Sequence, residues 1–236
     1  MGSTQLPEDY LIMKEALNEI KDVWLSAWNN KAFRNHFIVG VLLLVAVMVT
    51  TSYFFNYIQD DKNGIELNDW VLKRLPSIDV SVFIVTLMLS SAALFALRGL
   101  SNPNMLMTFL FALIIHLIAR MITISATQFF PPQGLIVLHD PMGSMLYQYR
   151  FISRDLFYSG HTAILSLLYF CSFKKLDKYY IMLTVIGVGF LLLVQHVHYT
   201  IDVLCAPLFA FGCFWLAKKL INSREAYIDG LESHLV

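Results

Sequence analysis

Charged residues are scarce in this sequence. Only 14% of its 236 residues are Asp, Glu, Lys or Arg, against about 25% in an ordinary soluble domain, whereas 57% are hydrophobic. So few charges cannot cover a surface that faces water on every side, and the composition therefore predicts a membrane protein. A surplus of positive charge is also missing, because the 17 basic residues equal the 17 acidic residues. Nucleic acids demand clustered positive charge, so we expect no nucleic acid partner.

Cysteine is rare as well. Cys171, Cys205 and Cys213 all lie inside apolar stretches, where a thiol behaves as a small hydrophobic group. We therefore expect neither disulfides nor a zinc site built from cysteine. The first 36 residues lack a short apolar core followed by a small-residue cleavage site, so we expect no removable signal peptide.

Long apolar stretches are abundant. A bilayer core of about 30 Å requires on the order of 20 apolar residues in a helix, and six stretches approach that length: 37–57, 80–97, 105–126, 156–173, 179–198 and 201–217. The sequence therefore predicts an all-α fold, a polytopic bundle of six transmembrane helices. We expect one domain over residues 37–217, with a cytoplasmic amphipathic segment at 1–36 before it and a cytoplasmic tail at 218–236 after it.

Basic residues are distributed unevenly between the two sides of such a bundle. The side that holds the N-terminus carries Lys14, Lys21, Lys31, Arg34, Arg98, Lys174, Lys175, Lys178, Lys218, Lys219 and Arg224. The other side carries Lys62, Lys73, Arg74, Arg150 and Arg154, and Arg120 lies inside a span. The positive-inside rule therefore predicts that both termini are cytoplasmic.

Apolar residues in the N-terminal segment recur every three or four positions, at Tyr10, Met13, Leu17, Ile20, Trp24 and Trp28. This spacing predicts an amphipathic helix. It lies either on the cytoplasmic face of the membrane or against cytoplasmic loops.

Polar residues form a stripe on the third predicted span. His116, Arg120, Thr123 and Thr127 are spaced by four, three and four residues, which places them on one helical face. Ionisable residues inside a span are costly and mark functional sites by default. The guanidinium of Arg120 suits the oxygens of phosphate, and the alternative is an ion pair with an interior carboxylate. For His116 a structural hydrogen bond is the favoured interpretation.

The start of the fourth predicted span combines a helix N-terminus with an imidazole. The relevant residues are Arg154, Asp155, Ser159, Gly160, His161 and Thr162. Free backbone N–H groups at a helix N-terminus bind anions, and glycine permits close approach of an anion to the backbone. The alternative is an N-cap serine followed by a structural histidine.

The junction of the last two spans holds His196, His198, Tyr199 and Asp202. His198 and Asp202 are four residues apart, so in a helical turn the carboxylate can orient the imidazole as a nucleophile. A zinc site made by His161, His196, His198 and Asp202 is the less favoured alternative. We expect His196 to be structural. The predicted topology brings all three groups of residues to the non-cytoplasmic side, which predicts one site there.

The first loop on that side is acidic, with Asp60, Asp61, Glu66 and Asp69. We expect a solvated connection, with selection of cationic headgroups as the alternative. Asp140 lies in the second loop, where it is placed to meet a headgroup amine.

The stretch from Arg120 to Pro132 and two further motifs resemble those of a known family. Ser153-Arg154-Asp155, three residues and Ser159-Gly160-His161-Thr162 form one block, and His198-Tyr199-Thr200-Ile201-Asp202-Val203 form the other. They are similar to the sphingomyelin-synthase-like branch of the phosphatidic acid phosphatase type 2 (PAP2) superfamily, and the chain looks like a compact bacterial member. The resemblance implies a six-span bundle in the bacterial inner membrane with its site on the exoplasmic side.

The resemblance also implies an activity. We expect a phosphotransferase that moves a phospho-headgroup from a glycerophospholipid to a lipid alcohol of the ceramide or diacylglycerol class, through a phosphohistidine. His198, Asp202 and His161 are expected to be catalytic. The residues expected to bind substrate are Arg120, Asp140, Arg154, Asp155, Ser159, Gly160, Thr162 and Tyr199. No cofactor or metal is expected. Hydrolysis by water, a non-catalytic lipid-binding scaffold and a homo-oligomer remain open alternatives.

Overall fold

The computed structural model describes residues 8–60, 63–140 and 152–222. Asp61, Lys62, Arg150 and Arg224 lie outside these ranges, as do residues 1–7 and 223–236 of the predicted terminal segments. Within the described ranges every regular element is a helix, as the all-α prediction requires.

Five helices are long and apolar enough to cross a membrane, which indicates an integral membrane protein. They are α2 (Lys31–Gln59), α3 (Ser81–Leu100), α4 (Pro103–Thr127), α7 (Lys175–Val194) and α8 (Thr200–Asn222). Two asparagines start helices as N-caps. The side chain of Asn30 accepts hydrogen bonds from the amides of Ala32 and Phe33, and that of Asn102 accepts one from Met105. Such caps satisfy amides that have no partner within the helix.

The predicted bounds of the fourth span, 156–173, are wrong. Only Gly160–Cys171 is helical there, and this helix, α6, has 12 residues, or about 18 Å at 1.5 Å per residue. Residues 156–159 lie outside the helix although they are mostly apolar, because tertiary contacts hold them in a non-helical path. The amide of Ser159 donates to the backbone oxygen of Asp202 at 3.1 Å. The boundary near residue 198 also differs, since α7 ends at Val194 and a turn over 195–199 leads into α8.

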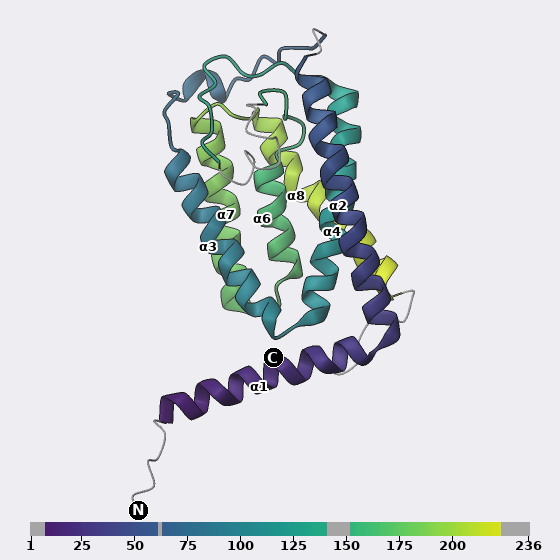
Figure 1. Ribbon diagram of the computed structural model, residues 1–236. Coiled ribbons are helices and arrows are strands. Elements are labelled where there is room, and N and C mark those ends of the chain that lie inside the picture. The colour runs from purple at the N-terminus through teal and green to yellow at the C-terminus, as the bar shows by residue number, and fades with distance from the viewer. Residues whose placement is uncertain (1–7, 61–62, 141–151, 223–236) are drawn as a thin grey trace, which may run out of the picture.

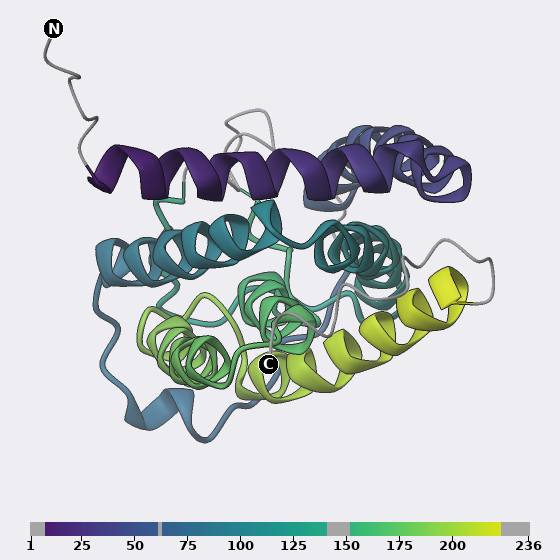
Figure 2. The same ribbon diagram turned by 90° about the horizontal axis from the view of Figure 1, so that it is seen from below.

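The short helix α6 lies in the middle of the bundle (Figures 1 and 2) and contacts α3, α4, α7 and α8. Its contact with α8 uses small buried side chains, namely Ala163, Ala206, Ala210 and Cys213. Small residues permit close approach of helices in a membrane. This close packing holds the start of α6, where His161 lies, next to the start of α8.

Helix α1 (Glu8–Asn29) lies across one end of the bundle (Figure 1). The indole N–H of Trp24 donates to the backbone oxygen of Leu100 at 2.8 Å, which ties α1 to the end of α3. Large apolar side chains on α1, including Tyr10, Met13 and Leu17, remain exposed. The predicted amphipathic helix is therefore present, and the apolar side chains that it exposes suit a membrane surface.

The opposite end, which we call the loop end, is formed by residues 63–80, 128–140 and 195–199. It includes the short 3-10 helix η1 (Leu72–Arg74). Gln195 holds both long loops, since it accepts from the amide of Val80 and donates to the hydroxyl of Ser81 and the backbone oxygen of Val137. His196 does the same, with ring nitrogens 2.8 Å from the backbone oxygen of Gln133 and 3.3 Å from that of Leu75. These contacts agree with a structural role for His196.

Candidate active site

His198 and Asp202 lie at the loop end, at the turn into α8. Nδ1 of His198 lies 3.4 Å from Oδ2 of Asp202, and both side chains are buried. The same Oδ2 atom accepts a hydrogen bond from the amide of Tyr199 at 3.0 Å. The carboxylate therefore has a fixed place against the imidazole, and an Nδ1–H proton directed to it leaves Nε2 as the basic nitrogen.

His161 lies in the first turn of α6, with Nε2 3.1 Å from Oδ2 of Asp140. The His161 side chain is 21% exposed and that of Asp140 is 11% exposed. His161 is thus more accessible than His198, whose side chain is 3% exposed. The contact gives Asp140 a partner within the chain, whereas the sequence alone suggested a headgroup amine as its partner.

Arg120 projects from α4 toward the segment before α6. Its guanidinium contacts the carboxylate of Asp155 and donates from Nε to the backbone oxygen of Tyr158 at 3.1 Å. Both Arg120 and Asp155 are largely buried. The ion pair with an interior carboxylate, one of the two alternatives for Arg120, is therefore present. Nη1 of Arg120 also lies close to Gly160, so the guanidinium reaches the start of α6.

One backbone hydrogen bond joins the two histidine-bearing helix starts. The amide of Ser159, the residue before α6, donates to the backbone oxygen of Asp202 in the first turn of α8 at 3.1 Å. Ser159 is also the N-cap of α6 and accepts from the amide of Thr162. His161 and Asp202 thus belong to two turns that are hydrogen-bonded to each other, and the Arg120 guanidinium lies beside the same helix start.

Two other predicted substrate-binding residues have structural contacts. The guanidinium of Arg154 contacts the backbone oxygen of Asn63 and lies 4.7 Å from the ring centre of Phe130. The hydroxyl of Tyr199 donates to the backbone oxygen of Phe130 at 3.1 Å and accepts from the amide of Leu67 at 3.3 Å. Both side chains therefore join the two long loops to the site.

Two residues near the site carry no signal in the sequence that would have identified them. Tyr158 is fully buried, and its hydroxyl lies 3.0 Å from Nδ1 of His116 while its backbone oxygen accepts from Arg120. His116 therefore has a structural hydrogen bond, as expected, with the segment before α6. Asp69 belongs to the loop predicted to be solvated, and that prediction is wrong for this residue. Its carboxylate accepts from Thr200 and from two amides of its own loop.

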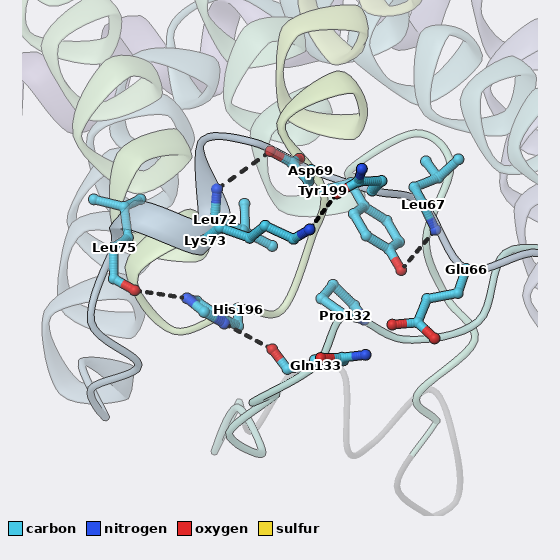
Figure 3. Close-up of a pocket in the computed structure, with 11 residues that line it drawn as sticks. Glu66, Leu67, Asp69, Leu72, Lys73, Leu75, Pro132, Gln133, His196 and Tyr199 are labelled. Carbon is cyan, nitrogen blue, oxygen red and sulfur yellow. Dashed lines mark hydrogen bonds between the residues drawn. The ribbon is translucent and has the colours of Figure 1, made fainter.

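A pocket of about 460 Å³ opens at the loop end beside this turn (Figure 3). Residues from both long loops and the turn line it, including Glu66, Lys73, Gln133, His196 and Tyr199. His196 lies two residues before His198 in the sequence, and Tyr199 directly follows it. The pocket therefore lies beside the turn that carries His198.

No group of three or more His, Cys, Asp or Glu side chains placed to hold a metal ion occurs within residues 8–60, 63–140 and 152–222. The suggested zinc ligands are engaged as described above, with His161 against Asp140, His196 against backbone oxygens and His198 against Asp202.

Gly160 offers a direct test of the Arg120 position. A Cβ atom at residue 160 would lie 2.5 Å from Nη1 and 2.9 Å from Cζ of Arg120, so Gly160→Ala must displace the guanidinium. We expect turnover to fall by about 10- to 100-fold. The midpoint of thermal unfolding should change little. Alanine favours the helix over glycine by roughly 0.5–1 kcal/mol, and this gain offsets part of the free-energy cost of moving the guanidinium.

Gly212→Ala on α8 is the matched control, because a Cβ atom there meets nothing within 4 Å. Steady-state turnover and thermal unfolding of both variants check the expectation. Equal turnover in the two variants would contradict a role for the observed position of Arg120.

Comparison with protein family models gives a match in the C-terminal part of the chain. Residues 154–219, which run from Arg154 through α6 and α7 into α8, match the family model described as PAP2 superfamily C-terminal. Neither the curated proteins nor the solved structures gave a match. The matched region contains His161, His198 and Asp202, and the match supports membership of the chain in the PAP2 superfamily, whose activities are of the lipid phosphatase and phosphotransferase type.

Proposed function

We propose that the protein is a membrane phosphotransferase that moves a phospho-headgroup from a glycerophospholipid to a lipid alcohol such as ceramide, and that it releases diacylglycerol. The observation that carries this proposal is the hydrogen bond between Ser159 and Asp202. It joins the two turns that bear His161 and His198. This supports an arrangement in which both imidazoles act on the same phosphoryl group.

His198 is the proposed nucleophile. Asp202 accepts a hydrogen bond from Nδ1–H, which stays protonated, and Nε2 attacks the phosphorus of the donor lipid. The bond between phosphorus and the diacylglycerol oxygen breaks, and a phosphohistidine forms at Nε2. Asp202 stabilises the positive charge on the ring, as carboxylates do for catalytic imidazoles.

His161 is the proposed general acid and base. In the first step protonated His161 donates its proton to the departing diacylglycerol oxygen. In the second step neutral His161 takes the proton of the acceptor hydroxyl, whose oxygen attacks phosphorus and releases Nε2 of His198. The contact with Asp140 supports this role, because a carboxylate beside an imidazole orients the ring.

Arg120 and the start of α6 are proposed to hold the phosphate oxygens. Phosphoryl transfer depends mainly on positioning and on stabilisation of charge. The guanidinium of Arg120 lies over Gly160, where the backbone N–H groups of a helix N-terminus also favour an anion. Asp155 limits the freedom of that guanidinium through their ion pair.

The proposed orientation places the loop end on the exoplasmic side, which is the periplasmic side in a bacterial inner membrane, and both termini in the cytoplasm. Hydrolysis with water as acceptor is the second candidate, because the PAP2 match is equally compatible with a phosphatase.

The test is a product assay with purified protein in vesicles. Headgroup-labelled phosphatidylcholine, phosphatidylethanolamine and phosphatidylinositol are each supplied with and without ceramide. Labelled phosphoceramide together with diacylglycerol supports the transferase. Water-soluble labelled phosphate ester in equal amounts with and without ceramide contradicts it in favour of the hydrolase. Absence of any diacylglycerol release contradicts both enzymatic proposals.

A further inference from the structure

The carboxylate of Asp69 bridges the first long loop and the start of α8. One oxygen, Oδ2, accepts from the amide of Thr200 at 2.6 Å. The other, Oδ1, accepts from the hydroxyl of Thr200 at 3.0 Å and from the amides of Val71 and Leu72 at 2.9 and 3.2 Å. Four donors therefore converge on one side chain, which lies 131 residues from Thr200 in the sequence.

Thr200 is the first residue of α8 and lies midway between His198 and Asp202. Its amide has no acceptor within the helix, as is general for a first turn. Asp69 supplies this acceptor from another loop, and a carboxylate at a helix N-terminus also interacts favourably with the helix dipole. The first turn of the helix is completed by two backbone hydrogen bonds. The amides of Asp202 and Val203 donate to the backbone oxygen of Tyr199 at 3.0 and 3.3 Å.

We propose that Asp69 is a positioning residue that fixes the first turn of α8 and thereby sets the approach of the His198 imidazole to Asp202; the proposal rests on the function proposed for His198. Asp69 acts through Thr200 and not on the substrate. The carboxylate holds the turn at Thr200, and the amide of Ser159 holds it at the backbone oxygen of Asp202.

The protonation state of Asp69 suits this role. Burial raises the pKa of its carboxyl group, but the hydrogen bonds from Thr200, Leu72 and Val71 lower the pKa by more, so that it lies below the ordinary value of 3.8. The anionic side chain is therefore present at neutral pH. Its contribution to stability is complete above about pH 4 and is lost as the pH falls through the lowered pKa.

The test compares Asp69→Asn with Asp79→Asn. Asp79 is the matched control, because its Oδ1 accepts from the amide and the hydroxyl of Ser81, the first residue of α3, in the same manner. Asparagine offers one carbonyl oxygen where aspartate offers two acceptors. Asp69→Asn therefore loses either the bond from the amide of Thr200 or the bonds from the hydroxyl of Thr200 and the two loop amides.

Rapid quenching with headgroup-labelled phospholipid measures the rate constant and the amplitude of phosphoenzyme formation. For Asp69→Asn we expect a rate constant lower by about 10- to 100-fold with the amplitude retained, and for Asp79→Asn neither quantity should fall. A reduced amplitude with an unchanged rate constant in Asp69→Asn would mean a smaller folded fraction and would overturn the positioning role. An unchanged rate constant and amplitude would overturn it as well.

A second measurement separates this proposal from the function itself. If the unmodified protein forms no phosphoenzyme, the proposed function fails, and amide hydrogen exchange then decides the role of Asp69. Asp69→Asn should speed exchange at the amides of Asp202 and Val203 by at least about tenfold, which corresponds to roughly 1.4 kcal/mol, and Asp79→Asn should not. Unchanged exchange at these two amides would overturn the proposal.

Discussion

Replacement of His198 by alanine is expected to abolish both turnover and covalent labelling of the protein by headgroup-labelled phospholipid. The reason is that Nε2 of this imidazole is the proposed attacking atom and Nδ1 is engaged by Asp202. Loss of a nucleophile of this kind costs on the order of 10⁴-fold or more. Two measurements check this expectation, namely the rate of turnover and the stability of the label on the unmodified protein. A phosphohistidine label should be labile in acid and stable in alkali.

His196→Ala is the neighbouring control. Both ring nitrogens of His196 face backbone oxygens of the loops, so its loss should weaken the loop end and leave the covalent label in place. If His198→Ala still formed the phosphoenzyme, or if His196→Ala alone lost it, the assignment of the nucleophile would be wrong.

The second large effect is expected at Arg120. Arg120→Leu removes a buried guanidinium that contacts the carboxylate of Asp155, and breaking a buried pair in this way costs about 3–5 kcal/mol. The double variant Arg120→Leu/Asp155→Leu removes both charges and should recover most of this stability. Its turnover should nevertheless remain about 10²- to 10³-fold below that of the unmodified protein, because the stabilisation of phosphate charge is lost.

Arg98 and Asp177 provide a matched pair at the opposite end of the bundle. They connect α3 and α7 with Nε of Arg98 2.8 Å from Oδ2 of Asp177. The variant Arg98→Leu/Asp177→Leu should leave turnover within about twofold, since these residues lie far along the bundle from His198 and His161. Recovery of full activity in Arg120→Leu/Asp155→Leu would show that Arg120 serves the fold alone. Thermal unfolding and initial rates of the four proteins decide between these outcomes.

Much of the fold follows from local composition. The apolar stretches of α2, α3, α4, α7 and α8 each exceed the length that a membrane crossing needs, so their existence was predictable while their ends were not. The stretch 156–173 is also largely apolar, but the helix begins only at Gly160. What stops it earlier is long-range, namely the contacts of Asp155 with Arg120 and of Ser159 with Asp202. Hydropathy contains no information on such contacts.

In the candidate site, too, local spacing was predictable from the sequence and long-range contacts were not. His198 and Asp202 were predictable because a spacing of four residues brings side chains together in a helical turn, and the structure places them 3.4 Å apart. The contacts of Asp140 with His161 and of Asp69 with Thr200 were not predictable, because they depend on the paths of two loops. In the sequence Asp69 is one of several acidic residues in a polar loop, and nothing local distinguishes the one whose carboxylate is hydrogen-bonded to the start of α8.

The shortness of α6 bears on the depth at which the chemistry takes place. Residues 172–174 connect α6 to α7 at the end of the bundle where α1 lies, and α7 has 20 residues against 12 in α6. At 1.5 Å per residue, α6 is about 12 Å shorter than α7 and therefore starts about that far below the top of its neighbour. If the proposed function holds, the donor phosphate must lie beneath the plane of the surrounding headgroups to reach the start of α6. Lipids with short acyl chains, whose leaflets are thinner, should then reach the histidines with the least distortion of the bilayer.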